Sequence, residues 1–324
     1  MEFWKNKKVL VTGGAGFIGS YVAEMLVGKK AVVSVADKAD PVKDSNLAVV
    51  TDKIVYLRKD LLDFANCLEV TKGMDVVMNI AAAVAGIDYN RSHQAEMFFS
   101  NAKLSLNMLE AARINKVKRF LVVSSACVYT RFCAIPTPEI EGFRFIPEDT
   151  NEGYGLAKRL AEFQGQAYAR DFGMEVAIAR PYNAYGPRDS FDPEKSHVIP
   201  ALIKRVFDGE DPLMVWGDGE QSRAFIYAED FARGLLEVAE KYPCADPLNI
   251  GTDEEIKIKD LVKLIVKLSG RKPKAVFDTT KPSGQPRRNC DNRKALEKIG
   301  FTADMPLEQG LKKTIEWYKQ KYVK

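Results

Sequence analysis

A single short glycine cluster constrains the fold of this chain more than any other feature of its sequence. Residues Gly14–Gly19 read GAGFIG, a GxGxxG pattern that directly follows Gly13. A β-rich run at Lys8–Thr12 precedes the cluster, and apolar residues at helical spacing in Phe17–Val27 predict a helix after it. Glycine permits the tight strand-to-helix turn, and the backbone N–H groups of such a turn can approach a pyrophosphate at the helix N-terminus.

The position of Asp37 supports the interpretation of this turn as a dinucleotide site. A second buried strand is predicted at Ala31–Ala36, and it ends at Asp37, about 20 residues after the glycines. A carboxylate there accepts hydrogen bonds from the adenosine ribose and repels a 2′-phosphate, so we expect NAD rather than NADP, although Lys38 follows directly. The alternative is a glycine turn without a ligand, with Asp37 as a solvated strand end.

The remaining periodicity predicts an α/β fold. Expected strands alternate with expected helices, and this alternation is typical of a doubly wound parallel sheet of the Rossmann kind. The further expected buried strands are Ile54–Leu57, Asp75–Ile80 and Phe120–Ser124, with a long helix at about Ala95–Ile114.

The second half of the chain is less regular and is punctuated by Gly/Pro turns. We predict that residues 1–180 form an NAD-binding Rossmann domain, with a chain return near 222–250, and that residues 181–324 form a smaller α/β substrate-binding domain. Ligands of open α/β sheets bind at the carboxyl edge of the strands, so the second part should cover that edge. Its expected helices are Val198–Phe207, Lys259–Leu268 and Leu307–Lys319.

Composition disfavours several other classes of protein. The net charge of +4 over 324 residues gives no reason to expect a nucleic-acid partner. We expect no membrane span, because no run of about 18 uncharged apolar residues is present. The start of the chain shows no signal-peptide pattern, and the five cysteines are scattered without a CxxC pair. We therefore expect a cytoplasmic protein without a disulfide framework or a metal site.

A second motif points to proton transfer. Tyr154 and Lys158 stand in the pattern YxxxK, which on a helix places them on one face. A nearby ammonium stabilises a phenolate, so we expect Tyr154 to act as a base on a substrate hydroxyl, and Lys158 can also hold a nicotinamide ribose. Ser125, at the end of a predicted strand, supplies a hydroxyl to orient the substrate oxygen. The alternatives are a surface helix and polar strand-end residues.

In this order, the motifs resemble the extended short-chain dehydrogenase/reductase family over nearly the whole chain. The resemblance implies NAD as cofactor and a nucleotide-diphosphate sugar as substrate. The segments that carry it are Thr12–Gly19, Asp60-Leu61, Asn79–Ala82, Asn101, SSACVY at Ser124–Tyr129, YGLAK at Tyr154–Lys158, RPYNAYGP at Arg180–Pro187, GDGEQSRAFIYAED at Gly217–Asp230 and NIG at Asn249–Gly251.

The resemblance also assigns roles to individual residues. It implies a catalytic triad of Ser125, Tyr154 and Lys158, and a homodimer formed through a four-helix bundle that includes the YxxxK helix. The implied cofactor contacts are Gly13, Gly16, Phe17, Ile18, Gly19, Asp37, Asp60, Leu61, Ala81, Ala82, Asn101, Tyr154 and Lys158. The implied contacts to the nucleotide sugar are Asn183, Lys195, Arg223 and Arg287.

Two branches of the family are most similar to this chain. Asn66–Gly73 and Asn107–Arg119 look like GDP-mannose 3,5-epimerases, whereas Gly186–Leu202 and Phe277–Arg287 look like GDP-L-fucose synthases. Enzymes of both branches move protons at C3 and C5 of a 4-keto GDP-sugar, and both place a cysteine where Cys127 stands. The synthases carry a histidine at the position of His197, and the epimerases use a lysine in that loop, where Lys195 lies close by.

The chemistry of these branches explains the pairing of a thiol with an imidazole. A ketone at C4 makes the C3 and C5 protons acidic, and inversion needs one group to remove a proton and another to deliver one from the opposite face. The ordinary pKa values of Cys and His, about 8.5 and about 6.5, suit both roles near neutrality. Cys127 and His197 are the predicted pair. The alternatives are a cysteine that packs as a small hydrophobe and a helix-cap histidine.

These observations predict an NAD-dependent nucleotide-sugar epimerase that oxidises C4 transiently and epimerises C3 and C5 of a GDP-sugar, as GDP-mannose 3,5-epimerases do. A 4-epimerase of the UDP-glucose type is the first alternative, and it would need only Ser125, Tyr154 and Lys158. An epimerase/reductase of the GDP-L-fucose synthase type is the second, and Asp37 disfavours its NADP. A 4,6-dehydratase would carry an acidic pair where Ala126-Cys127 stands. The non-enzyme alternative is an NAD-binding regulator.

Overall fold

The computed structural model describes residues 2–40, 46–84, 86–193, 196–281 and 285–323. Its centre is a seven-stranded sheet in the order β11-β6-β5-β4-β1-β2-β3, in which every neighbouring pair is parallel. The predicted doubly wound sheet is therefore confirmed. Its strands are β1 (Lys8–Thr12), β2 (Val32–Asp37), β3 (Ile54–Arg58), β4 (Val76–Asn79), β5 (Arg119–Val123), β6 (Glu175–Pro181) and β11 (Leu248–Ile250).

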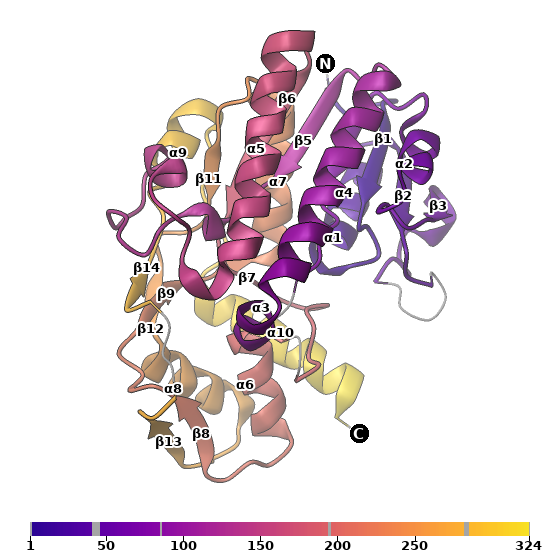
Figure 1. Cartoon of the computed structure of the whole chain (residues 1–324). Coiled ribbons are helices and arrows are strands. Elements are labelled where there is room, and N and C mark those ends of the chain that lie inside the picture. Colours follow the sequence, from indigo (N-terminus) through magenta and orange to yellow (C-terminus); the bar gives the residue numbers. More distant parts are fainter. Residues whose placement is uncertain (1, 41–45, 85, 194–195, 282–284, 324) are drawn as a thin grey trace.

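Helices cover both faces of this sheet (Figure 1). Alternate residues of a strand point to opposite faces: Val9 and Val11 join a core beneath α1 and α7, whereas Leu10 joins a core beneath α2, α4 and α5. The helices are α1 (Phe17–Gly28), α2 (Phe64–Thr71), α3 (Ile87–Ser92), α4 (Gln94–Ile114), α5 (Glu152–Phe172), α6 (Val198–Phe207), α7 (Ala228–Lys241), α8 (Ile258–Ser269), α9 (Arg293–Ile299) and α10 (Leu307–Tyr322).

Most expected elements appear close to their predicted bounds, and α6 has the bounds predicted for it. One expectation is wrong, because Ile54–Leu57 is not a buried strand. In the structure β3 lies at the edge of the sheet, where it pairs with β2 alone, and Val55 is 54% exposed. A short apolar run does not distinguish an edge strand from a central one.

A second, smaller apolar core lies below the carboxyl edge of the large sheet (Figure 1). Helices α6, α8 and α10 pack there with short strands, whereas α7 and β11 return to the large sheet. The division at residue 180 stays a prediction. The short strands are β7 (Ala184–Tyr185), β8 (Leu213–Trp216), β9 (Ser222–Ala224), β10 (Ile226–Tyr227), β12 (Glu255–Lys257), β13 (Ala275–Asp278) and β14 (Arg287–Arg288).

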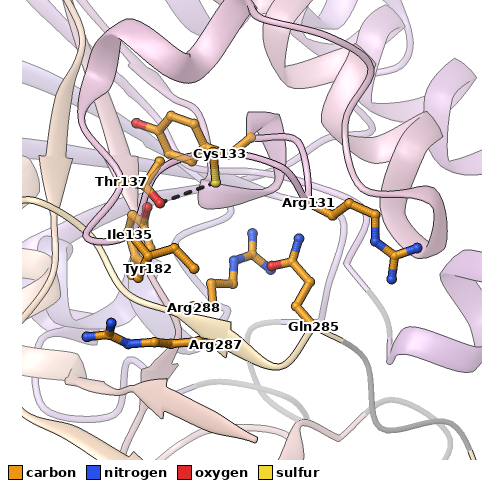
Figure 2. A pocket seen from close by; sticks show the side chains of 9 residues that line it. Arg131, Cys133, Ile135, Thr137, Tyr182, Gln285, Arg287 and Arg288 are labelled. Carbon is orange, nitrogen blue, oxygen red and sulfur yellow. Dashed lines mark hydrogen bonds between the residues drawn. The ribbon is translucent and has the colours of Figure 1, made fainter.

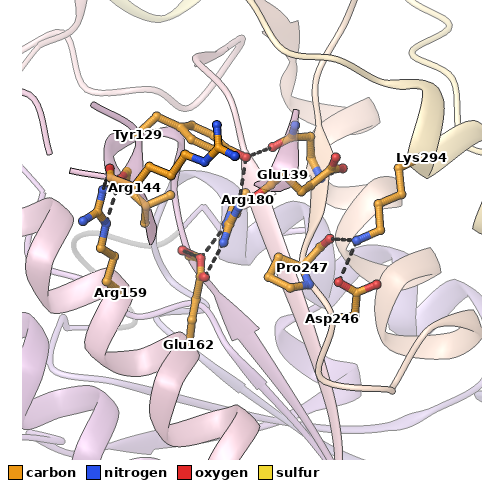
Figure 3. Close-up of polar contacts among 12 residues, drawn as sticks. Tyr129, Glu139, Arg144, Arg159, Glu162, Arg180, Asp246, Pro247 and Lys294 are labelled. Atoms are coloured by element: carbon orange, nitrogen blue, oxygen red, sulfur yellow. Dashed lines mark hydrogen bonds and ion pairs between the residues drawn. The ribbon is translucent and has the colours of Figure 1, made fainter. Parts of the chain in front are cut away.

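A buried ion pair ties α5 to the sheet (Figure 3). Arg180 of β6 donates from Nε and Nη2 to the two carboxylate oxygens of Glu162 on α5, at 2.8 and 2.7 Å, and both side chains are almost fully buried. Arg180 also donates from Nη1 to the hydroxyl of Tyr129 at 3.1 Å, and that hydroxyl donates to Asn249 Oδ1 of β11 at 2.6 Å. The helix that carries the YxxxK motif is thus fixed against β6 by charge-assisted hydrogen bonds.

Among the described residues, no helix is both long enough and apolar enough to cross a membrane.

Candidate active site

The glycine turn between β1 and α1 leaves no room for side chains. Gly13 has φ +66°, and a Cβ there would lie 2.8 Å from the Cα of Ala81. A Cβ on Gly19 would lie 2.1 Å from the carbonyl oxygen of Gly13. Helix α1 begins after Gly16 with no side-chain cap. The N–H groups of its first turn are therefore free of side-chain acceptors, which suits a bound phosphate.

Acidic side chains follow the next two strands at the same edge of the sheet. Asp37 ends β2, and its carboxylate accepts hydrogen bonds from the N–H groups of Ala15 and Ala39, at 3.1 and 3.0 Å. This carboxylate therefore stands directly against the glycine turn. Asp60 follows β3 and is exposed, whereas Leu61 is buried. The cofactor contacts predicted for these residues are compatible with that placement.

Hydrogen bonds shape the segment that follows β4. Ala81 donates its N–H to Thr12 Oγ1 at 3.0 Å. Asn101 of α4 is buried, accepts the N–H of Ala83 at 3.0 Å, and donates to the carbonyl oxygens of Ala83 and Met97 at 3.1 and 2.8 Å. Because its amide is fully engaged with backbone groups, Asn101 acts in this structure as a support for the loop. Its direct contact to a cofactor stays a prediction.

The structure brings the three predicted triad residues together. Tyr154 and Lys158 lie in the first two turns of α5, with the Lys158 ammonium 5.4 Å from the Tyr154 ring centroid. Lys158 Nζ donates to the carbonyl oxygen of Val123, the last residue of β5, at 2.8 Å. Ser125 follows two residues later, and its Oγ accepts the N–H of Cys127 at 3.1 Å. The YxxxK face therefore meets the end of β5.

Burial has the largest effect on the pKa values of Tyr154 and Lys158. It raises the pKa of Tyr154 well above the usual value for tyrosine, and the nearby Cys127 adds to that effect, whereas a hydrogen bond with Ser125 opposes it. Burial also lowers the pKa of Lys158 to about 8, although Cys127 and Glu162 act in the opposite direction. In this structure burial therefore has a larger effect on the Tyr154 pKa than its neighbours have, and the role of Tyr154 as a base stays a prediction.

Arg288 is a site residue that the sequence did not reveal. It lies on β14, beside Cys127 and Tyr182. Burial lowers the pKa of Arg288, but Cys127, Tyr182 and Glu148 together oppose that effect, so the net shift is upward.

Arg287, one of the predicted contacts to the nucleotide sugar, has a different environment from that of Arg288. Its Nε and Nη2 donate to the carboxylate of Glu255, each at 2.9 Å, and its side chain is half exposed. Figure 2 shows Arg287 and Arg288 leaving the strand in different directions around a narrow pocket, because neighbouring strand residues face opposite sides. The pocket is lined by Tyr129, Arg131, Cys133, Ile135, Thr137, Tyr182, Gln285, Arg287 and Arg288.

Two arginines lie side by side on the neighbouring strands β9 and β14. The parallel pairing of β14 with β9 places Arg288 opposite Arg223. Burial, together with the charge of Arg288, lowers the pKa of Arg223 to about 10. Among the described residues, neither arginine forms an ion pair with a carboxylate. Two adjacent cations without such partners suit an anionic ligand.

Three predicted site residues remain, namely His197, Asn183 and Lys195. His197 precedes α6 and is 50% exposed, and its Nδ1 lies 3.8 Å from Oδ1 of the buried Asp189, whose carboxylate raises the pKa of the histidine. Asn183 donates to the carbonyl oxygen of Ala224 at 3.1 Å and so braces β9. Lys195 lies outside the described residues. Within them, the structure shows no contact between His197 and the cysteine after β5.

No cluster of His, Cys, Asp and Glu among the described residues could hold a metal ion.

Comparison with known proteins gives concordant results. The model of the NAD dependent epimerase/dehydratase family matches residues 9–251. GDP-mannose 3,5-epimerase 1 of Oryza sativa subsp. japonica is 32% identical, with 100% of this chain and 85% of that protein covered. GDP-L-fucose synthase 1 of Arabidopsis thaliana is 31% identical, with 97% and 94% covered. The structure of UDP-glucose 4-epimerase with UDP-glucose from Thermotoga maritima is 28% identical, with a TM-score of 0.86 and with 97% and 99% covered.

Proposed function

Because the chain belongs to the NAD dependent epimerase/dehydratase family and uses NAD as its cofactor, we propose that it is a GDP-sugar epimerase that oxidises C4 transiently and inverts C3 and C5. The observation that carries this proposal is the surroundings of Cys127. Arg288 lies beside the thiol, and Tyr154 and Lys158 are also close to it. A cysteine that serves only as packing would not need a cation beside it.

The residues of the carboxyl edge fit the cofactor. The turn from Gly13 to Gly19 and the uncapped start of α1 would receive the pyrophosphate, and Asp37 would receive the adenosine ribose. Asp60 and Leu61 would lie against the adenine, and the Ala81-Ala82 segment and Lys158 against the nicotinamide ribose. When bound, NAD supplies the acceptor for a hydride from C4 of the sugar and later returns it.

The side chains of the chain itself would carry the protons. Ser125 and Tyr154 would orient the C4 hydroxyl, and Tyr154 would pass its proton onward. The Lys158 cation lies close to the Tyr154 ring and would stabilise the negative charge on Tyr154 while the proton moves. Cys127, beside Arg288, would exchange a proton at C3 or C5, with His197 acting from the other face.

The two converging arginines support a diphosphate substrate. Arg223 and Arg288 present guanidinium groups from adjacent strands, the arrangement that bidentate recognition of phosphate uses. We therefore place the diphosphate between them, in place of the exposed Arg287, with Asn183 as the support of β9. The preference for GDP rests on the two plant relatives, whose names specify GDP-linked substrates or products.

A homodimer and a cytoplasmic location complete the proposal. Helices α4 and α5 pack side by side and expose Phe99, Leu106 and Phe163. Such an apolar face on two adjacent helices suits a four-helix interface with a second copy. All five cysteines are unpaired, as in proteins of a reducing compartment.

A 4-epimerase of the UDP-glucose type is the second candidate, and the similarity to the Thermotoga maritima enzyme favours it. The two functions are separated by a panel of GDP-, UDP- and dTDP-sugars incubated with the chain in deuterated water and followed by NMR. The proposed function requires deuterium at C3 or C5 of a GDP-sugar. Inversion at C4 without exchange at any carbon would contradict it and support the second candidate.

A further inference from the structure

A buried carboxylate beside the two converging arginines has an oxygen without a hydrogen bond. Glu148 is 94% buried, given its relative exposure of 6%, and its Oε1 has no hydrogen-bond partner among the described residues. Its other oxygen, Oε2, accepts hydrogen bonds from the Thr150 hydroxyl and from Asn151 Nδ2, the latter at 3.4 Å. The carboxylate is therefore held at one oxygen and free at the other.

The backbone places Glu148 next to the reacting groups. Its N–H donates to the carbonyl oxygen of Tyr129 at 3.3 Å. The preceding residue, Pro147, packs against Gly155 in the first turn of α5. A Cβ added at Gly155 would lie 2.8 Å from Pro147 Cβ and 2.3 Å from the carbonyl oxygen of Cys127. Glu148 thus stands between the turn that carries Cys127 and the start of the YxxxK helix.

The charge of Glu148 reaches both arginines without an ion pair to either. Burial and Arg288 lower the pKa of Arg223, and Glu148 acts against both effects. At Arg288, burial also lowers the pKa, and Glu148 is among the groups that oppose it. No contact of 4.0 Å or less joins the carboxylate to a cation in the described chain. Its role is therefore not the simple neutralisation of a neighbouring guanidinium.

A buried acceptor with no donor costs free energy, unless a ligand supplies the donor. No described group of the chain donates to Glu148 Oε1, whereas a sugar brings several hydroxyl donors. We propose that Glu148 is a sugar-binding residue that accepts a hydrogen bond from a hydroxyl of the sugar ring and thereby sets which sugar is accepted. This proposal rests on the nucleotide-sugar substrate proposed above, but it does not depend on which carbon is inverted.

Two variants separate the charge of Glu148 from its reach. Glu148→Gln keeps the size and removes the charge, and Glu148→Asp keeps the charge and withdraws it by one methylene. The measurement is the dissociation constant of GDP and of GDP-mannose by calorimetry, repeated with UDP and UDP-glucose. The unaltered chain should bind the sugar form of its nucleotide more tightly than the bare diphosphate.

The nucleotide sugar and the bare diphosphate should respond differently to Glu148→Gln. Loss of a charge-assisted hydrogen bond should weaken binding of the nucleotide sugar about 10-fold or more. Loss of a negative charge beside the diphosphate should leave binding of the bare diphosphate unchanged or several-fold tighter. Glu148→Asp should weaken binding of the sugar form alone. Glu152→Gln, in the first turn of α5, is the matched control and should change neither constant.

Equal changes for both ligands in both variants would overturn the role of Glu148, since a structural or purely electrostatic group does not distinguish them. The thermal midpoint and NAD binding of each variant report folding, and if the Gln variant unfolds, the Asp variant decides alone. Solvent exchange at C3 or C5 is scored separately. If solvent exchange occurs but both ligands change equally in affinity, the role of Glu148 is refuted and the proposed function is kept. If the two ligands change differently as predicted but no solvent exchange occurs, the role of Glu148 is kept and the proposed epimerisation is refuted.

Discussion

Lys158 lies in an environment very different from that of an exposed lysine. It is 4% exposed, and burial lowers its pKa to about 8, although Cys127 and Glu162 favour the cation. An unfolded lysine titrates near 10.5, the ordinary value. Lys158 therefore loses its proton at a pH about 2.5 lower in the folded chain than in the unfolded chain. Between these two pKa values, activity and stability should change in opposite directions.

Solvent exchange into the sugar should fall as the pH rises through about 8, because the Lys158 cation is lost. Over the same interval the unfolded state binds more protons than the folded state, so the free energy of unfolding should rise, by on the order of 3 kcal/mol by pH 10.5. The comparison is with Lys158→Met, which cannot titrate. A difference in thermal midpoint between the two proteins that stays constant from pH 7 to 10 would contradict the lowered pKa.

Cys127 and His197 test the acid–base pair. Cys127→Ser replaces the thiol by a hydroxyl, and His197→Asn removes an imidazole whose pKa Asp189 raises. Each change should reduce deuterium incorporation at C3 and C5 by a factor on the order of 10²–10⁴, with nucleotide-sugar binding nearly unchanged. Cys244→Ser, at an exposed cysteine, is the control. If both variants keep normal exchange, the two side chains are bystanders.

At the scale of elements, the alternation of β14 decides which arginine meets the substrate. Arg288 faces Cys127 and lies opposite Arg223, whereas Arg287 is paired with Glu255. Arg288→Ala and Arg223→Ala should each weaken nucleoside diphosphate binding by roughly 1.5–3 kcal/mol. Arg287→Ala should change it by less than about 0.5 kcal/mol, as for other exposed side chains. Calorimetry with GDP gives these numbers, and the reverse order of effects would restore Arg287 as the contact.

The elements differ in how far the sequence predicts them. Helix α6 and strand β1 were predictable, because each has enough residues for its period to be counted, and the glycine turn between β1 and α1 has its own signature. Strand β14 has two residues, so nothing in it distinguishes the inner arginine from the outer one. That distinction comes from its pairing with β9, which lies more than 60 residues earlier in the chain.

The site divides in the same way. Tyr154, Lys158 and Ser125 were predictable because one helix face and one strand end position them locally. Glu148 was not predictable, because its burial and its free oxygen arise only when the loop before α5 folds against the segment after β5 that contains Tyr129. The raised pKa of Tyr154 was missed for a related reason, since proximity to an ammonium is visible in a motif and burial is not.

At the scale of the whole molecule, the packed helices α4 and α5 expose several large apolar side chains. Gln164 of α5 donates to the carbonyl oxygen of Leu106 on α4 at 3.2 Å, which places Phe163 beside Leu106. Phe163 is 59% exposed and Phe99, two turns before Leu106, is 61% exposed. Isolated apolar side chains are common on surfaces, but a row of them across two packed helices is typical of an interface.

Phe163→Glu should therefore convert a dimer to a monomer, because it buries a charge in the proposed four-helix interface. We expect the dimer dissociation constant to rise at least 100-fold in sedimentation velocity, about 2.7 kcal/mol or more. Val49→Glu, at an exposed apolar residue before β3, should leave the dimer intact. Because α5 also carries Tyr154 and Lys158, the monomer should lose part of its solvent-exchange activity as the helix loosens. An unaltered chain that sediments as a monomer at micromolar concentration would refute the interface, and this face would then have to bind something other than a second copy.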